Sequence, residues 1–237
     1  MLQHLTGGLV TDRDLATPLL TLYDGPARVE LSGATTANWV AKTANLLVDG
    51  HGGPQRVGVL LPLHWQAVCF LLGAAATGAT VVVAAEPAEL AGCEVAFVLA
   101  EHAAAALDAG VEDVLAVSGH PLGARCTGLP AMVLDAAVEV PGHGDHFTGP
   151  RVTQARVEVE GVAWSRRDLA LSPGERVLTT LPPDTRAGLD VVLDALAAGA
   201  SLVLVTGQAD VAAICAAERV TATAGVVVPG VRRLTSA

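Results

Sequence analysis

Lysine is almost absent from this chain, and Lys42 is the only one in 237 residues. The 14 basic residues, nearly all arginine, face 24 acidic ones, which gives a formal net charge of -10, and aromatic residues make up only 3%. A negative chain repels nucleic-acid backbones and anionic lipid head groups, and scarce aromatics leave little surface for base stacking. Nucleic acid and membranes are therefore not expected as partners.

Cysteine is also scarce, and the copies are too far apart for a Cys-x-x-Cys motif: Cys69, Cys93, Cys126 and Cys215. Cys69 and Cys215 lie in apolar helical runs and are predicted to be small core residues. No signal peptide is predicted, because the first residues lack a basic stretch followed by a long apolar run. Together these features predict a protein of the reducing cytoplasm. Abundant alanine, glycine, valine and arginine are typical of a GC-rich bacterial genome.

The long uncharged run Trp65–Ala85 has about the length that spans a bilayer. Thr77 and Gly78 interrupt it, the residues beyond them are β-branched, and no basic residue flanks it closely. We therefore predict a buried helix, a tight turn and a buried strand.

The sequence contains an internal repeat. Residues 56–83 and 176–204 each run Arg-Val, an apolar strand, Leu-Pro, a helix of about four turns, Gly-Ala and a second apolar strand. Ala27–Leu31 (ARVEL) has a counterpart in Ala155–Val159 (ARVEV), and each is predicted to precede a helix. Strands alternating with helices predict an α/β fold with two similarly wound βαβ lobes and mainly parallel sheets.

Three ranges follow from this organisation. We predict a first α/β lobe over residues 1–118, an inter-lobe connection over 119–150 with one short strand, and a second lobe over 151–237. The crevice between two such lobes is the default position for a ligand.

Three segments carry motifs of a known family: GVAWSRRDL at 161–169, RVLTTLPPDTRAGL at 176–189 and AERVTATAGVVVPGVRRL at 217–234. The first two match the patterns GVxxTHxNL and RxLxxLPxxHxxGL. With these segments the chain resembles the N-terminal region of acyl-adenylate-forming enzymes, which include acyl-CoA synthetases, luciferases and peptide-synthetase adenylation domains. It is most similar to a small actinobacterial family of this size. The resemblance implies the fold of the acyl-CoA synthetase N-terminal domain.

The departures from that family lie in the chemical motifs. The enzymes hold the ATP phosphates on a loop of the form TSGTTGxPKG just before the GVxxTH segment. Here Val152–Val159 covers the loop and Glu160 takes the lysine position, so the segment has no glycine and carries the acids Glu158 and Glu160. We predict a strand over Ala155–Glu160 instead. The downstream GYGxTE motif, ribose-binding aspartate and catalytic lysine have no counterpart, so ATP and Mg²⁺ are not expected as cofactors.

The enzymes' histidine in LPxxH is replaced by Thr185, which Asp184 and Arg186 flank. The resemblance places these three residues at a polar crevice wall, and they are the candidate ligand-binding residues. No catalytic residue is predicted.

Two further segments carry polar side chains that could bind a metal or an anion. His143, Asp145 and His146 are weak metal-ligand candidates, and a polar, glycine-rich turn is favoured because no second ligand cluster is visible. Residues 165–168 (SRRD) are predicted to open a helix, with arginines that hold an anion or, preferably, pair with nearby acids. Lys42 is predicted to be solvated on the polar side of a helix over Thr35–Val48.

These features favour a pseudoenzyme: a degenerate, non-adenylating relative that acts as a binding or interaction module for an unknown small molecule or protein. The alternative is a half-enzyme of the acyl-CoA ligase type, AMP-binding and completed by a separate C-terminal synthetase domain. A structural subunit that forms a homo-oligomer is a third possibility.

Overall fold

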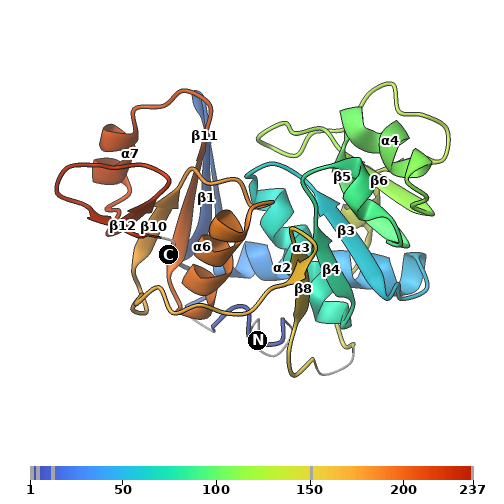
Figure 1. Cartoon of the computed structure of the whole chain (residues 1–237), viewed down its shortest axis with the longest axis horizontal. Coiled ribbons are helices and arrows are strands. Elements are labelled where there is room, and N and C mark those ends of the chain that lie inside the picture. The colour runs from blue at the N-terminus through green and yellow to red at the C-terminus, as the bar shows by residue number, and fades with distance from the viewer. Residues whose placement is uncertain (1–2, 4–5, 12–13, 150–151, 236–237) are drawn as a thin grey trace.

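Two sheets flank a central layer of helices in the computed structural model, which describes residues 3, 6–11, 14–149 and 152–235 (Figure 1). Sheet A has the strand order β13-β12-β10-β11-β1-β2, and sheet B has the order β7-β6-β5-β3-β4-β8-β9. The bounds in sheet A are β1 Pro18–Asp24, β2 Ala27–Ser32, β10 Arg176–Thr179, β11 Ser201–Thr206, β12 Ala222–Ala224 and β13 Arg232–Arg233. The bounds in sheet B are β3 Arg56–Leu60, β4 Thr80–Val83, β5 Val95–Leu99, β6 Asp113–Val117, β7 Val133–Asp135, β8 Arg156–Val159 and β9 Val162–Ala163.

Helices cover both faces of each sheet. The central layer holds α2 Gly33–Asn45, α3 Trp65–Thr77 and α6 Arg186–Ala197 (Figure 1). The outer helices are α4 Ala103–Asp108 on sheet B and α7 Val211–Ala217 on sheet A. The remaining helical pieces are α5 Ala136–Glu139, a π-helical turn Leu46–Gly50 after α2, and 3₁₀ turns at Pro87–Leu90, Ala100–His102 and Val140–Gly142.

Alternate residues along the strands explain the layers. In β5, Val95 and Phe97 join the central core, while Ala96 and Val98 pack in a second cluster with the α4 residues Ala103 and Ala106. In sheet A, Leu178, Val203 and Val205 form a third cluster with Ile214 and Cys215 of α7. Because successive strand residues point to opposite faces, both sheets are buried on two sides. The predicted α/β class with mainly parallel sheets is confirmed.

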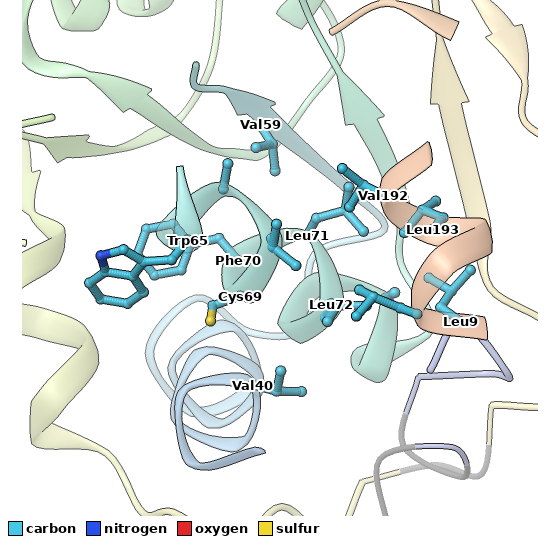
Figure 2. Close-up of a cluster of buried hydrophobic side chains, with 14 of the residues drawn as sticks. Leu9, Val40, Val59, Trp65, Cys69, Phe70, Leu71, Leu72, Val192 and Leu193 are labelled. Atoms are coloured by element: carbon cyan, nitrogen blue, oxygen red, sulfur yellow. The ribbon is translucent and has the colours of Figure 1, made fainter. Parts of the chain in front are cut away.

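Helix α3 is buried on every side. Thr77 at its last position is the one residue of α3 that is not buried, and Gly78 ends the helix with a φ of 85° before β4 begins. Figure 2 shows α3 side chains between Val40 of α2 and Val192 and Leu193 of α6. The predicted helix, turn and strand over 65–85 are therefore confirmed. Within the described residues, every helix falls short of the length and apolarity that a bilayer crossing requires.

The two sequence-similar segments form units with the same pairing. β3-α3-β4 pairs Arg56 with Thr80, and β10-α6-β11 pairs Arg176 with Ser201, both in parallel. In each unit the next strand along the chain, β5 or β12, adds beside the first strand. The same winding order thus occurs in both sheets.

Each sheet takes its outer hairpin from the other half of the chain. The antiparallel hairpin β1-β2 adds to sheet A because β1 lies parallel to β11, and the hairpin β8-β9 adds to sheet B because β8 lies parallel to β4. The predicted strand over 155–160 is confirmed as β8. By its place in the sheet, the counterpart of β8 is β1, although the sequence of β8 resembles that of β2. A helix was predicted after β8, but the strand β9 follows it.

Sheet membership therefore crosses the predicted ranges 1–118, 119–150 and 151–237. As a division into domains these ranges remain a prediction. The predicted strand of the connection is present as β7, which pairs with β6 of sheet B. Pro150 and Arg151, at the boundary between the second and third ranges, lie outside the described residues.

Candidate functional site

A two-residue turn stands where the family resemblance implies a phosphate-binding loop. Val159 of β8 pairs with Val162 of β9, so only Glu160 and Gly161 connect the strands. Their φ angles are 53° and 70°. Positive φ at both central residues is the mark of a type I′ hairpin turn, which suits the right-handed twist of two short strands. The segment is an ordered hairpin.

Both acids of this hairpin already have partners. The Glu158 carboxylate accepts hydrogen bonds from Arg56 Nη2 at 2.8 Å and Nη1 at 3.2 Å. This charge-assisted pair lowers the pKa of Glu158. Glu160 Oε1 accepts the backbone N–H of Arg186 at 3.2 Å. A carboxylate from the turn thus lies at the N-terminus of α6, where backbone N–H groups favour an anion.

The three predicted crevice residues lie together where the chain leaves β10 and enters α6. Thr185 is the N-cap of α6: its Oγ1 accepts from the Gly188 N–H at 3.1 Å and donates to the Pro182 carbonyl at 2.9 Å. Arg186 donates from Nε to Asp190 Oδ1 at 2.8 Å and from Nη2 to the Ser165 carbonyl at 2.9 Å. Both side chains hold the helix start in place.

Asp184 differs from its two neighbours. Its Oδ1 atom is buried and has no hydrogen-bond partner among the described residues. Burial raises the pKa of Asp184, and the carboxylates of Glu89 and Glu160 raise it further, while a backbone hydrogen bond lowers it. Of the predicted site residues, Asp184 is the one with a free acceptor.

Two buried acids on α6, which the sequence reading did not single out, face the segment after β9. The side chains of Asp190 and Asp194 are only 1% exposed. Trp164 Nε1 donates to Asp190 Oδ1 at 2.8 Å, and Arg167 Nε lies 3.3 Å from Asp190 Oδ2. Asp194 accepts the Arg167 backbone N–H at 3.1 and 3.2 Å, and Arg166 Nε lies 3.9 Å away. In the sequence, two acids four residues apart in an otherwise apolar helix were the signal that could have indicated this buried pair.

Asp194 has a shifted pKa in this seam, the contact between α6 and residues 164–171. Burial raises its pKa to about 7; the Arg167 N–H lowers it, Asp190 raises it, and Arg166 and Arg186 lower it. Residues 164–171 form no helix. The predicted helix at residues 165–168 is therefore wrong, because pairing with buried acids holds this segment extended along α6. The predicted pairing of the arginines with acids is confirmed.

The interface between α3 and α6 leaves only a small cavity. Its volume is about 10 Å³, room for a single water molecule. Its walls are formed by Val59, Leu61, Leu63, His64, Ala67, Val68, Leu71, Val83, Pro183, Leu189 and Val192. Burial lowers the pKa of His64 to about 4, so its imidazole is neutral. His64 Nδ1 accepts the Gln66 N–H at 3.2 Å and caps α3. The packed core here leaves no space for an organic ligand.

The weak metal candidates lie in an exposed loop tied to α2. Lys42 Nζ donates to the carbonyls of Pro141, at 3.3 Å, and His143. Lys42, which was predicted to be solvated, is half-buried and anchors this loop. Asp145 and His146 are exposed, with 3.8 Å between Oδ1 and Nδ1. No group of three His, Cys, Asp or Glu side chains able to hold a metal occurs in the part of the chain that the structure describes.

Comparison with solved structures identifies the architecture. An acyl-CoA synthetase of Brucella canis superposes with a TM-score of 0.73 at 15% identity, over 94% of this chain and 47% of the synthetase. Apo MatB of Rhodopseudomonas palustris gives 0.68 at 16% identity, over 95% of this chain and 50% of MatB. The N-terminal domain of FACL13 from Mycobacterium tuberculosis gives 0.64 at 19% identity, over 89% of this chain and 59% of that domain. The chain thus has the fold of the N-terminal part of these proteins and spans about half their length.

Comparison of sequences gives a nearer relative. A TIGR03089 family protein of Mycobacterium tuberculosis strain H37Rv is 41% identical over 208 residues, which cover 81% of this chain and 84% of the relative. No protein-family model matches the chain.

Proposed function

Since this chain belongs to the TIGR03089 family, we propose that it is a pseudoenzyme that retains the fold of the N-terminal part of adenylate-forming ligases. It binds a small molecule or a protein partner and does not form acyl-adenylates. The four cysteines are all free, which supports the reducing cytoplasm as its location.

The single observation that carries this proposal is the turn at Glu160 and Gly161. Binding a triphosphate on a loop requires several successive backbone N–H groups that face the ligand. Val159 and Val162 flank the turn and pair with each other, so no further loop residues are available. The α6 N-terminus already receives the Glu160 carboxylate. Added phosphate would meet negative charge at this position.

The closed seam beside α6 gives further support. Three arginines that could otherwise face an anion, Arg166, Arg167 and Arg186, are directed at Asp190 and Asp194. Each of these guanidinium groups has a buried acid as its partner. These arginines therefore stabilise the fold and do not present a positive charge to a substrate.

Ligand binding in this proposal involves the predicted crevice residues Asp184, Thr185 and Arg186. Asp184 supplies a free carboxylate oxygen at the start of α6. A ligand group with an N–H or O–H donor would satisfy this oxygen, whose lack of a partner destabilises the free protein. Thr185 and Arg186 would fix the wall.

ATP–pyrophosphate exchange with a broad panel of carboxylic acids tests the loss of adenylation. We expect no exchange above background, with an active acyl-CoA synthetase as positive control. Robust exchange by the isolated chain would overturn the proposal.

A thermal-shift screen with ATP, AMP, CoA, acyl-adenylate analogues and a metabolite library tests the binding role. A ligand at a hundred times its Kd stabilises the folded state by about 2.7 kcal/mol, which is several degrees for a domain of this size. A crevice ligand should lose its shift in Asp184→Ala and keep it in Asp108→Ala, where an exposed acid is removed. Equal shifts in both variants would rule out the crevice.

A half-enzyme is the second candidate, because the chain spans only about half the length of the ligases that it resembles in fold. In this proposal another polypeptide supplies the remaining parts. Affinity purification from the native cell, followed by the exchange assay on the recovered complex, tests it. Exchange by the complex but not by the chain alone would favour the half-enzyme.

A further inference from the structure

Helix α7 ends on a left-handed residue that is not glycine. Arg219 has a φ of 53° and follows the C-cap Glu218. The Arg219 N–H bonds to the Ala216 carbonyl at 3.4 Å, and the Val220 N–H bonds to the Cys215 carbonyl at 2.9 Å. These two bonds define a Schellman motif, whose left-handed position is usually glycine because a Cβ atom is strained there.

Three other α-helices among the described residues are followed by a left-handed residue, and each of these residues is glycine. Gly78 follows α3 with a φ of 85°, Gly110 follows α4 with a φ of 90°, and Gly199 follows α6 with a φ of 76°. Glycine is frequent in this chain, with 25 copies, so it was an available solution for α7 as well. The contrast indicates that position 219 carries arginine for its side chain.

That side chain lines an open hollow of about 400 Å³ at the amino ends of β1, β10 and β11. The other lining residues are Pro18, Glu30, Gly174, Arg176, Ser201, Ala217 and Glu218. This volume is in the range of small-molecule sites. The hollow lies at the opposite edge of sheet A from Asp184, which follows the carboxyl end of β10.

Partly buried polar contacts organise one wall of the hollow. Arg176 Nη2 donates to Thr21 Oγ1 at 2.8 Å and pairs with the Glu218 carboxylate, and Nη1 donates to Ser201 Oγ at 3.3 Å. Glu218 Oε1 also accepts from Tyr23 Oη at 2.6 Å and from Arg28 Nε at 2.8 Å. Because both oxygens of Glu218 are engaged, this acid is compensated.

Arg219 lines the hollow with a guanidinium group that has no partner among the described residues. Its guanidinium makes no hydrogen bond or ion pair with any other residue that the structure describes. Arginine presents a planar fork of donors that matches a carboxylate or phosphate group with two parallel hydrogen bonds. A positive charge at a helix C-terminus also complements the helix dipole, but lysine would serve that purpose equally.

We propose that this hollow binds a small molecule through a carboxylate or phosphate group. Arg219 donates hydrogen bonds to that group next to the ordered Arg176 guanidinium. The site is separate from the crevice and from any adenylation chemistry. The ligand class follows from the planar Arg219 guanidinium, which has no partner among the described residues.

Titration of the wild-type protein with inorganic phosphate and with malonate, at constant ionic strength kept with chloride, tests the site. Backbone amide shifts in NMR spectra report both binding and position. We expect saturable shifts at residues around α7 and the start of β10, and the tighter of the two anions identifies the preferred group. Arg219→Gly should weaken binding at least tenfold without lowering Tm, because glycine relieves the strained backbone.

Two further variants make the test specific. Arg219→Lys keeps the charge at the helix end but lacks the planar fork, so it should also weaken binding several-fold. Arg125→Ala removes an exposed arginine outside the hollow and should bind like the wild type. The proposal is overturned if neither anion binds saturably to the wild type, or if Arg219→Gly or Arg219→Lys binds as tightly as the wild type.

Discussion

The Trp164 indole N–H donates to Asp190 Oδ1 at 2.8 Å and joins the end of the β8-β9 hairpin to helix α6. The hairpin belongs to sheet B and α6 packs against sheet A, so this bond links a part of sheet B to a helix of sheet A. The same carboxylate group receives Arg186 and Arg167. Asp190 is thus shared by three partners.

Asp190→Ala should destabilise the fold strongly. Removal of one partner from a buried charged network leaves the others without compensation, and such changes cost about 3–5 kcal/mol. Urea denaturation measures the loss. Asp108→Ala, an exposed acid on α4, is the control and should stay within about 0.5 kcal/mol of the wild type. A loss below about 1 kcal/mol for Asp190→Ala would show that the network does not hold the hairpin.

Asp194 should make stability decrease toward alkaline pH. Its folded-state pKa is about 7, whereas the ordinary value is 3.8, so the folded state retains a proton that the unfolded state has released. The stabilising contribution is complete below pH 3.8 and is lost as the pH rises through 7. Asp194→Asn removes this titration. Between pH 5 and pH 8, the unfolding free energy of the variant relative to that of the wild type should rise by more than about 1 kcal/mol.

Denaturant titrations of both proteins at the two pH values give that difference. Asp108→Asn is the matched exposed control and should show no such shift. A pH-independent difference for Asp194→Asn would mean that Asp194 is ionised throughout this range.

Glu218 should show the opposite pH dependence. Burial alone would raise its pKa, but hydrogen bonds from Arg28, Tyr23 and Arg176 outweigh burial and lower the value to about 2. Its contribution is therefore present above the ordinary pKa of 4.5 and is lost as the pH falls through 2. Glu218→Gln should cost about 3 kcal/mol at pH 7 and less at pH 3. Glu30→Gln, at an exposed partner of Arg28, should cost less than about 1 kcal/mol at either pH.

Leu193→Ala tests the contact between the central helices. Leu193 of α6 is fully buried beside α3 (Figure 2), and a cavity at such a site costs about 2–5 kcal/mol. Leu122→Ala is the matched control because Leu122 is 71% exposed. Equal midpoints of thermal unfolding for the two variants would contradict the assignment of this core.

Local sequence patterns predicted the βαβ units, because each strand and helix there is a mainly apolar run bounded by Pro or Gly. They also predicted that Ala155–Glu160 is a strand. Patterns of this kind do not report which strand pairs with which. The placement of β1 beside β11 depends on contacts such as Leu20 with Leu202, which lie far apart in the sequence.

The candidate site was harder to predict for the same reason. A serine followed by two arginines resembles a helix start, yet Asp190 and Asp194 of α6 offer these residues stronger partners and keep them extended. Tertiary charge pairing overrides a weak local preference. Similarly, Lys42 has the sequence context of a solvated lysine, and only the fold brings the carbonyls of the 141–143 turn to it.

The exchange of hairpins between the two halves has a consequence for how the chain folds on the ribosome. Sheet A cannot be completed until β11 emerges, although β1 is made before it, and sheet B must wait for β8. Contacts between distant segments slow folding because loop closure precedes any gain in contacts. Neither half of the chain holds a full sheet, so neither half can complete its fold without the other.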